Sequence, residues 1–323
     1  MIRSLVSVLL AALASLSFTA CGDPGASPAA TPGATPGGSS ASSTPATPWV
    51  LRCTGIPDSK TSDLAKEYVL VKDYLAKALG ADVQFEIVKD YDAAVTALTS
   101  GKADLAWLGG HTTVIAEESG KVELVACRDL DLRFKTYFIA HKDAFERLGG
   151  KQLGSLAELK GKVEGLKFTF GSQGSTSGHL MPRHFMNLQG VPPEATFGKD
   201  NVAYSGNHSN TLKQVSDGTV HVGALNYTDW EKASAEVKAS APLLYVTPDY
   251  VDYCWVANQS LGKERIARIR AALTSLDKAN PEHAPILEAW GKAGRLLAAD
   301  PAAWQGIRDV RAELLKSGIL KRK

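Results

Sequence analysis

Short apolar segments alternate with segments of helical periodicity along most of this chain, beginning at Val50. Val50–Ile56 predicts a strand, and apolar residues spaced three and four positions apart then predict a helix that stops at Gly80. The pattern continues with predicted strands at Val83–Val88, Asp104–Leu108 and Val122–Arg128 and predicted helices at Tyr91–Thr99 and Thr112–Glu118. Such alternation is typical of a mostly parallel sheet covered by helices.

A second series of the same kind follows. Its predicted strands are Lys167–Phe170, Asn201–Tyr204 and Val220–Asn226, and its predicted helices span about 178–189 and Ser209–Asp217. Pro182 lies inside the first of these helices, so that helix either begins later or is bent. The 275 residues after position 48 exceed the usual size of a single core, so we expect two lobes.

Two apolar segments are placed to connect these lobes. Thr136–His141 follows the first series and Tyr253–Ala257 follows the second, so each is expected to carry the chain between lobes. Predicted helices at about 263–276 and 301–315 then return to the first lobe. The expected architecture is an α/β protein in which residues 49–140 and 253–323 form lobe 1 and residues 141–252 form lobe 2.

The first 48 residues predict export. A positive start and the apolar stretch Leu5–Ala20 are typical of a signal peptide over residues 1–20. Phe18–Thr19–Ala20–Cys21 is similar to a bacterial lipobox, which predicts lipidation of Cys21; the alternative is an ordinary signal peptide with a chance cysteine. Residues 22–48 contain 6 Pro, 5 Gly, 5 Ser, 4 Thr and 6 Ala, so residues 21–48 are expected to form a lipid-anchored, flexible linker.

The composition argues against several classes of function. A net charge of +2 offers no excess of positive charge for nucleic acid. The spacing of the four cysteines fits no zinc or redox motif, and we expect neither a metal nor a cofactor. The sequence contains no GxSxG, HExxH or P-loop motif, so an enzyme is not expected, and a phosphoester hydrolase is kept only as an alternative.

One strand-to-helix turn is rich in hydroxyls. Residues 171–179, Gly-Ser-Gln-Gly-Ser-Thr-Ser-Gly-His, follow an apolar strand and precede a helix. Backbone N–H groups at a helix start and Ser or Thr hydroxyls together bind anions, and glycines let the backbone approach the bound group. The alternative is a plain helix N-cap, but four hydroxyls exceed what one cap needs. The turn therefore predicts an anion site at Ser175, Thr176 and Ser177.

Two more turns repeat this arrangement. Tyr204–Asn210 places His208 at a strand-to-helix junction, where its ring N–H can donate to an oxyanion; a capping histidine is the alternative. In the first lobe, Trp107–Thr113 brings Gly110, His111 and Thr112 to a similar position. Ligands of parallel α/β sheets lie beyond the carboxyl ends of the strands, so these turns predict a ligand held between the lobes.

These motifs resemble those of the phosphonate/phosphite-type substrate-binding proteins of ABC importers. The likeness rests on the turns above and on Gly223–Asn226, and it covers roughly Leu51–Ala257 in motif order. It implies a type II periplasmic-binding-protein fold, two α/β lobes joined by two crossing strands, with Ser175, Thr176, Ser177 and His208 holding an oxyanion. Within the family, residues 171–183 and Ala224–Asn226 look closest to members regarded as selenate binders.

The chain also departs from the family. Its aminoalkylphosphonate binders hold the ligand amine with carboxylates, whereas the corresponding strand here ends in Asn226, which favours an inorganic or small-substituent oxyanion. His111 replaces the usual aromatic residue after the glycine pair. Asp58 is positioned to accept a hydrogen bond from a protonated oxyanion such as phosphite; a turn-capping role is the alternative.

The cysteines leave a further alternative. Cys127 and Cys254 lie on predicted strands near the crossings and would form a disulfide in an oxidising compartment, with Cys53 buried in the first strand. A free thiol near the cleft would instead suit a thiophilic ligand, as in an arsenite-type sensor of the same fold.

The sequence thus predicts a monomeric binding lipoprotein at the periplasmic or outer face of the cytoplasmic membrane. Its ligand would be a small tetrahedral oxyanion of the phosphite, phosphonate or phosphate class, or selenate. Its protein partners would be an ABC permease and its ATPase, and it would meet the membrane only through the lipid anchor.

Overall fold

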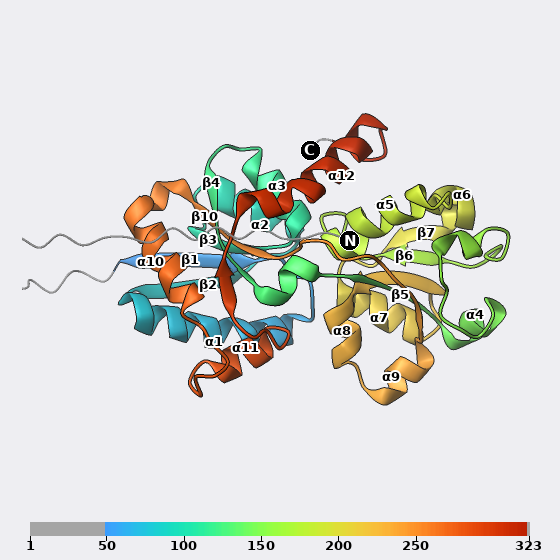
Figure 1. Cartoon of the computed structure of the whole chain (residues 1–323), viewed down its shortest axis with the longest axis horizontal. Helices are drawn as coiled ribbons and strands as arrows, with labels where there is room; N and C mark the ends of the chain where they lie inside the picture. The colour runs from blue at the N-terminus through green and yellow to red at the C-terminus, as the bar shows by residue number, and fades with distance from the viewer. Residues whose placement is uncertain (1–48, 322–323) are drawn as a thin grey trace, which may run out of the picture. The chain divides into compact units, whose positions relative to one another are not determined.

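The computed structural model describes residues 49–321, which fall within one compact unit, Thr47–Lys323 (Figure 1). The predicted signal peptide, Cys21 and the linker lie outside the described residues. Among the described residues, no helix combines the length and the apolar character needed to span a bilayer.

The first sheet has the strand order β11-β4-β10-β3-β1-β2. Its strands are β1 (Val50–Gly55), β2 (Asp82–Ile87), β3 (Leu105–Leu108), β4 (Val122–Arg128), β10 (Cys254–Asn258) and β11 (Leu296–Ala298). The helices of this lobe are α1 (Thr61–Leu79), α2 (Tyr91–Thr99), α3 (Gly110–Glu117), α10 (Lys263–Thr274), α11 (Ala284–Ala289) and α12 (Gln305–Lys316). β1 pairs in parallel with β2 and β3, as the alternation predicted, whereas β10 is antiparallel to β3 and β4.

The second sheet has the order β7-β6-β8-β5-β9. Its strands are β5 (Thr136–Ala140), β6 (Phe168–Phe170), β7 (Val202–Tyr204), β8 (Val222–Asn226) and β9 (Leu243–Val246). Its helices are α4 (Lys142–Arg147), α5 (Met181–Leu188), α6 (Pro193–Phe197), α7 (His208–Ser216), α8 (Tyr227–Lys232) and α9 (Ala235–Ser240). β6 runs parallel to β7 and β8, and β5 runs antiparallel to β8 and β9.

The chain crosses between the two sheets twice. It leaves the first sheet after β4, through a short 3₁₀ segment, η1 (Asp129–Arg133), and it returns between β9 and β10. The two crossing segments pair with each other, because the backbone N–H groups of Phe134 and Tyr250 each donate to the other residue's carbonyl. Residues 136–140, which we assigned to lobe 1, pair as β5 in the second sheet, since the crossing occurs before them.

The π-helical turn η3 (Thr176–Leu180) accounts for Pro182. This turn precedes α5, so Pro182 lies in the first turn of that helix. The carbonyls of Ser177 and Gly178, to which an N–H at position 182 would donate, accept instead from the Thr136 hydroxyl and the Gly171 N–H, so proline leaves neither carbonyl without a partner. The helix begins later than the residue pattern suggested, and the extra turn holds Thr176, Ser177 and Gly178 in place.

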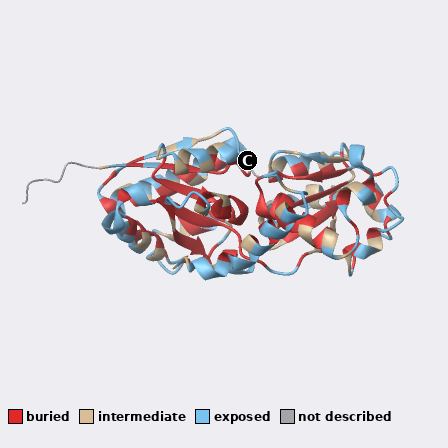
Figure 2. Ribbon diagram, turned by 90° about the horizontal axis from the view of Figure 1, so that it is seen from above, coloured by how far each residue is buried: buried red, intermediate tan, exposed pale blue. Residues whose placement is uncertain are grey.

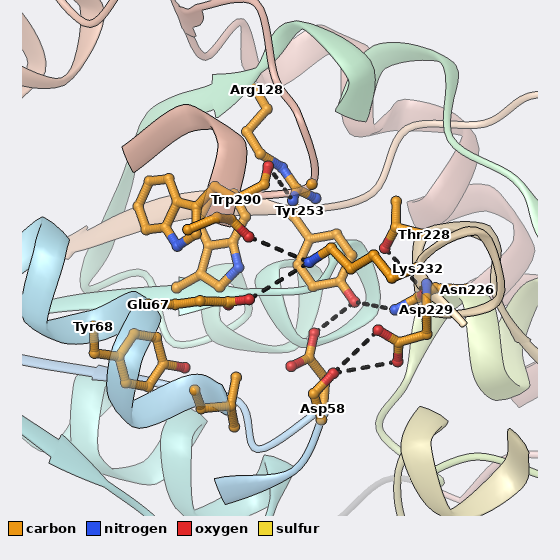
Figure 3. Close-up of a pocket in the computed structure, with 15 residues that line it drawn as sticks. Asp58, Glu67, Tyr68, Arg128, Asn226, Thr228, Asp229, Lys232, Tyr253 and Trp290 are labelled. Atoms are coloured by element: carbon orange, nitrogen blue, oxygen red, sulfur yellow. Dashed lines mark hydrogen bonds and ion pairs between the residues drawn. The ribbon is translucent and has the colours of Figure 1, made fainter. Parts of the chain in front are cut away.

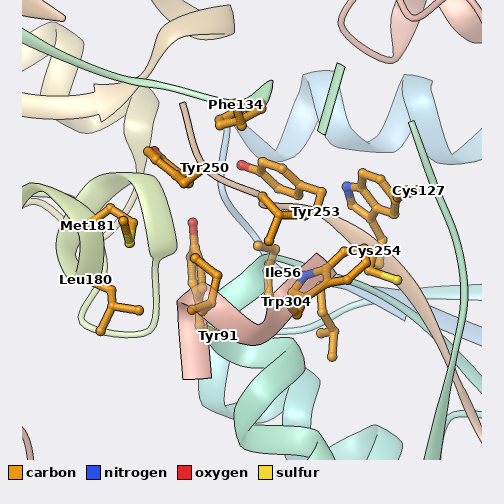
Figure 4. Packing of buried hydrophobic residues seen from close by; sticks show 14 of the residues in the cluster. Ile56, Tyr91, Cys127, Phe134, Leu180, Met181, Tyr250, Tyr253, Cys254 and Trp304 are labelled. Atoms are coloured by element: carbon orange, nitrogen blue, oxygen red, sulfur yellow. The ribbon is translucent and has the colours of Figure 1, made fainter. Parts of the chain in front are cut away.

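Buried residues follow the strands of both sheets (Figure 2), and buried aromatic side chains gather around the crossings (Figure 4). Trp107 stacks on Tyr253 and on Trp290, with ring centroids 5.4 and 5.1 Å apart. The Arg128 guanidinium lies 5.1 and 5.0 Å from the Trp107 and Tyr253 rings and forms a buried ion pair with Asp131 of η1. These contacts fix the end of β4 and the start of the first crossing against the second crossing.

The predicted disulfide is absent from this cluster. Cys127 on β4 and Cys254 on β10 are both buried free thiols, and so is Cys53 on β1. Burial raises the pKa of the Cys127 thiol to about 12 and raises those of the other two further. The disulfide prediction was therefore wrong for this structure; these cysteines pack as small apolar side chains.

Candidate ligand-binding site

The Ser175–Gly178 turn is buried and lies between β6 and α5. The Ser175 hydroxyl accepts a 2.9 Å hydrogen bond from the Gly178 N–H. The Ser177 hydroxyl lies beside Asp252 and Tyr250 but makes no well-aligned hydrogen bond within the described chain. A Cβ added at Gly178 would lie 3.0 Å from both the Ser175 hydroxyl and the His208 ring, so only glycine fits here without displacing the turn.

His208 begins α7 and faces this turn as an uncharged donor. Its Nδ1 accepts the Asn226 backbone N–H at 3.2 Å, and its Nε2 lies 3.5 Å from the Ser175 hydroxyl. Burial lowers the pKa of His208 to about 3, so the ring is neutral at neutral pH. Since Nδ1 accepts, the single ring proton is on Nε2 and points toward Ser175. A ring in this tautomer donates a hydrogen bond and does not accept the serine proton, as a hydrolase would require.

The β3–α3 turn of the first lobe meets the Ser175–Gly178 turn of the second. The His111 N–H donates to the Thr176 hydroxyl at 2.9 Å, and the Gly110 N–H donates to Asp252 Oδ1 at 2.8 Å. The Thr112 hydroxyl instead donates back to the Gly109 carbonyl within its own helix start. The structure therefore brings Gly110 and His111 to the predicted site, while the Thr112 hydroxyl serves its own helix.

Two buried residues at this site were missed by the sequence reasoning. Tyr91, the first residue of α2, packs against Gly174, and its hydroxyl lies beside Ser175 without a well-aligned hydrogen bond. Asp252 lies on the second crossing beside Thr176 and Ser177. Neither residue belongs to a motif. The only available signal is that Tyr91 opens a predicted helix and Asp252 immediately precedes a predicted strand.

Asp252 is held firmly by its backbone and is almost completely buried, at 1% exposure. Its N–H donates to the Asp131 carbonyl, and its own carbonyl accepts from Trp304 Nε1, both at 2.9 Å. Its Oδ1 accepts from Gly110, but its Oδ2 has no partner within the described chain. Burial, and secondarily the Asp131 charge, raise the pKa of Asp252 to about 7, against hydrogen bonds that lower it.

A separate small cavity, about 40 Å³ in volume, contains the other two predicted residues, Asp58 and Asn226 (Figure 3). The Tyr253 hydroxyl donates to Asp58 Oδ2 at 2.7 Å, and Asn226 Nδ2 donates to the Tyr253 hydroxyl at 3.4 Å. The cavity adjoins the turn region, because the His208 N–H donates to the Asp58 carbonyl. Asp252, rather than Asp58, therefore lies against the hydroxyls of the turn.

The charged groups of this cavity already have partners. The Ser59 hydroxyl lies 3.2 Å from both carboxylate oxygens of Asp229. Lys232 pairs with Glu67 of α1 at 3.5 Å and donates to the Ala289 carbonyl at 3.2 Å. Each of these contacts joins α8 of the second lobe to the first lobe.

Neither metal nor thiol chemistry gains support from this geometry. Within the described residues, no group of three or more His, Cys, Asp or Glu side chains is placed to hold a metal ion. No cysteine lines the cavity, and the burial of the three described thiols disfavours the reactive thiolate that an arsenite-type sensor would need.

Known proteins resemble this chain over most of its length. A family model described as the periplasmic phosphonate substrate-binding protein of ABC transporters matches residues 54–304. A probable ABC transporter phosphite binding protein, PhnD1 of Prochlorococcus marinus (strain MIT 9301), is 34% identical over 281 residues, which cover 84% of this chain and 92% of that protein.

Solved structures agree with this likeness. PhnD1 in complex with methylphosphonate matches with a TM-score of 0.77 and 33% identity, over 84% of this chain and 100% of that chain. A binding protein component of a Pseudomonas aeruginosa ABC phosphonate transporter matches with a TM-score of 0.72 over 84% of this chain and 87% of that chain; at 20% identity it shows the fold alone. The predicted type II periplasmic-binding-protein fold is confirmed, and the chain belongs to the family of periplasmic phosphonate substrate-binding proteins of ABC transporters.

Proposed function

We propose that this protein captures a small tetrahedral oxyanion of the phosphite and alkylphosphonate class between its lobes and delivers it to an ABC permease and its ATPase. The observation that carries the proposal is a set of buried polar atoms that make no well-aligned hydrogen bond within residues 49–321 and lie where the two lobes meet: the Ser177 hydroxyl, the Tyr91 hydroxyl and Asp252 Oδ2. Each buried, unsatisfied polar group costs about 1 to 3 kcal/mol. An oxyanion beside the two hydroxyls would accept hydrogen bonds from them and recover that energy.

The donors around this point are uncharged. They are the hydroxyls of Ser175, Thr176 and Ser177, the neutral His208 ring and the backbone at the starts of η3 and α3. Hydrogen bonds to a charged group contribute about 1.5 to 3 kcal/mol each, so four to six of them exceed the roughly 8 kcal/mol of a micromolar complex before desolvation and closure are subtracted. Neutral donors also permit release once the lobes separate.

The relatives support the same ligand class. PhnD1 is named a phosphite binding protein, and its structure contains methylphosphonate. We therefore propose phosphite and methylphosphonate as the ligands, and selenate is the anion to be compared with them. The proposal includes anchoring through Cys21, which rests on the lipobox-like sequence, and a monomer that contacts the membrane only through this anchor.

Titration calorimetry of the exported protein tests the proposal. Phosphite and methylphosphonate are expected to bind, and Ser177→Ala is expected to weaken them about tenfold or more, with little change in the free energy of unfolding, because the hydroxyl has no partner to lose. The matched control is Ser172→Ala in the same turn, whose hydroxyl accepts from the Gly174 N–H and is expected to matter little for affinity. Equal affinity of the wild type and Ser177→Ala would contradict the placement, and no binding of any oxyanion by the wild type would refute the function.

A further inference from the structure

An anion site does not ordinarily include a buried carboxylate, yet Asp252 lies within this one. The Asp252 side chain lies beside the Thr176 and Ser177 hydroxyls. Its Oδ1 accepts from the Gly110 N–H at the start of α3, and its Oδ2 has no well-aligned partner within the described chain. A Cβ at Gly109 would lie 3.3 Å from Asp252 Oδ1 and 3.2 Å from the Thr176 hydroxyl, so the carboxylate is wedged between the turns of both lobes.

The groups that face Asp252 do not neutralise it. Asp131 from the first crossing raises its pKa, and the tyrosines that face it are Tyr91 of α2 and Tyr250 and Tyr253 of the same crossing. His111 approaches through the β3–α3 turn, and His208, across Ser175, is neutral. The buried guanidinium of Arg128 is paired with Asp131.

A fully ionised anion placed against an ionised Asp252 would face like-charge repulsion in a site that excludes water. One proton between the two oxygens converts this repulsion into a charge-assisted hydrogen bond, as two carboxylates sharing one proton do. The proton arrives on the anion, or it is taken from solvent by Asp252.

We propose that the site binds its anion together with one proton shared with Asp252 Oδ2, and that Asp252 thereby selects monoprotonated oxyanions over fully ionised ones. This inference rests on the proposed function. Phosphite and alkylphosphonates carry an O–H that ionises near neutral pH, as phosphate groups do, so they bring the proton with them. Sulfate and selenate carry no proton at neutral pH, and binding them requires proton uptake from solvent. No covalent bond changes, and the proton remains in the complex.

Proton linkage in the wild type tests this without any substitution. Selenate titrated at about pH 8 in two buffers of different ionisation enthalpy should show uptake of about one proton per anion, and its affinity should fall by up to about tenfold per pH unit above neutrality. Phosphite should bind more tightly than selenate. Selenate binding without proton uptake, or selenate affinity equal to that of phosphite, would overturn the inference.

The Asp252→Asn variant supplies the second test, because its amide can donate to an ionised anion while its Oδ1 still accepts from Gly110. We expect the preference for phosphite over selenate to narrow about tenfold or more and the proton uptake with selenate to disappear. The matched control is Asp249→Asn, which removes a partly exposed carboxylate from the same crossing and should leave both unchanged. An unchanged preference in Asp252→Asn with phosphite still bound refutes this inference alone, whereas a wild type that binds none of the anions refutes the proposed function.

Discussion

Two neighbouring polar regions join the lobes, and they differ in whether their polar atoms already have partners. Around the Ser175–Gly178 turn, the buried Ser177 hydroxyl makes no well-aligned hydrogen bond in the part of the chain that the structure describes, and the donors are uncharged. In the cavity beside it, the carboxylates of Asp58, Asp229 and Glu67 already contact Tyr253, Ser59 and Lys232. Under the proposed function, the unpartnered groups of the turn region serve the ligand, and the Asp229 and Glu67 contacts hold the lobes together.

One residue from each region, His208 and Asp229, responds to pH in the opposite direction from the other. The pKa of His208 falls on burial from 6.5 to about 3, so between these values the unfolded chain binds more protons and acidification destabilises the fold. The pKa of Asp229 rises from 3.8 to about 7, mainly through burial and then through Asp58, so the folded chain binds more protons in that window and a rising pH destabilises it. Substitutions of His208 and of Asp229 should therefore change stability with opposite pH dependence.

The largest expected effect comes from adding a methyl group to the Ser175–Gly178 turn. Gly178→Ala places a methyl group 3.0 Å from His208 and Ser175, and we expect about a hundredfold loss of phosphite affinity together with about 1 to 3 kcal/mol of lost stability. Calorimetry and urea denaturation measure the two effects. The matched control is Gly306→Ala in α12, where a Cβ meets nothing within 4 Å and a small gain in stability is expected. Wild-type affinity in Gly178→Ala would show that the turn does not hold the anion.

The next prediction concerns the pH dependence that Asp229 gives to the free energy of unfolding. Asp229→Asn removes a carboxyl whose ionisation is disfavoured, so its gain in the free energy of unfolding should grow by about 1 to 2 kcal/mol between pH 5 and pH 8, allowing for partial exposure. Urea denaturation at both pH values measures it. Asp217→Asn is the control of opposite sign, because hydrogen bonds from Lys213 and Thr219 lower the pKa of Asp217 to about 2 and its loss should destabilise the fold at neutral pH. A pH-independent gain would count against the buried-carboxylate interpretation.

The smallest effect concerns the ion pair between the lobes. Lys232→Met removes the partly exposed contact with Glu67, and we expect the ligand to dissociate a few-fold faster, a change of about 0.5 to 1 kcal/mol that salt diminishes. Stopped-flow release at low and high salt measures it. Lys238→Met is the matched control, because Lys238 contacts Glu231 and Trp230, which belong to its own lobe. Equal effects of the two substitutions would show that the Lys232 contact does not stabilise lobe closure.

Most helices and strands could be predicted because their periodicity is local. Tyr91–Thr99 and Val122–Arg128 have the predicted bounds, and α1 ends at Gly80, whose φ of 61° lies in the left-handed region. The assignment of residues 136–140 depended on where the chain changes sheet, which no local pattern specifies. The disulfide prediction failed for a similar reason, since proximity to the crossings does not fix how two thiols are oriented.

The residues of the candidate site also fall into two groups, those that a local sequence pattern predicts and those that it does not. Ser175, Thr176, Ser177 and His208 follow strands in recognisable turns, and the structure brings them together. Tyr91 and Asp252 reach the same point only because the lobes meet there. Asp58 was predicted to accept from the ligand, and in this structure its Oδ2 accepts from the hydroxyl of Tyr253, 195 positions away.

The position of Asp252 has a mechanical consequence. The residue lies two positions after Tyr250, which forms the backbone bridge between the crossing segments. The Asp252 N–H donates to the Asp131 carbonyl of the other crossing segment, and the Asp252 carbonyl accepts from Trp304, so its main chain would move little if the lobes separated about this bridge. An anion entering the site would then meet the same carboxylate before and after the lobes close. An anion without a proton would be repelled at both stages.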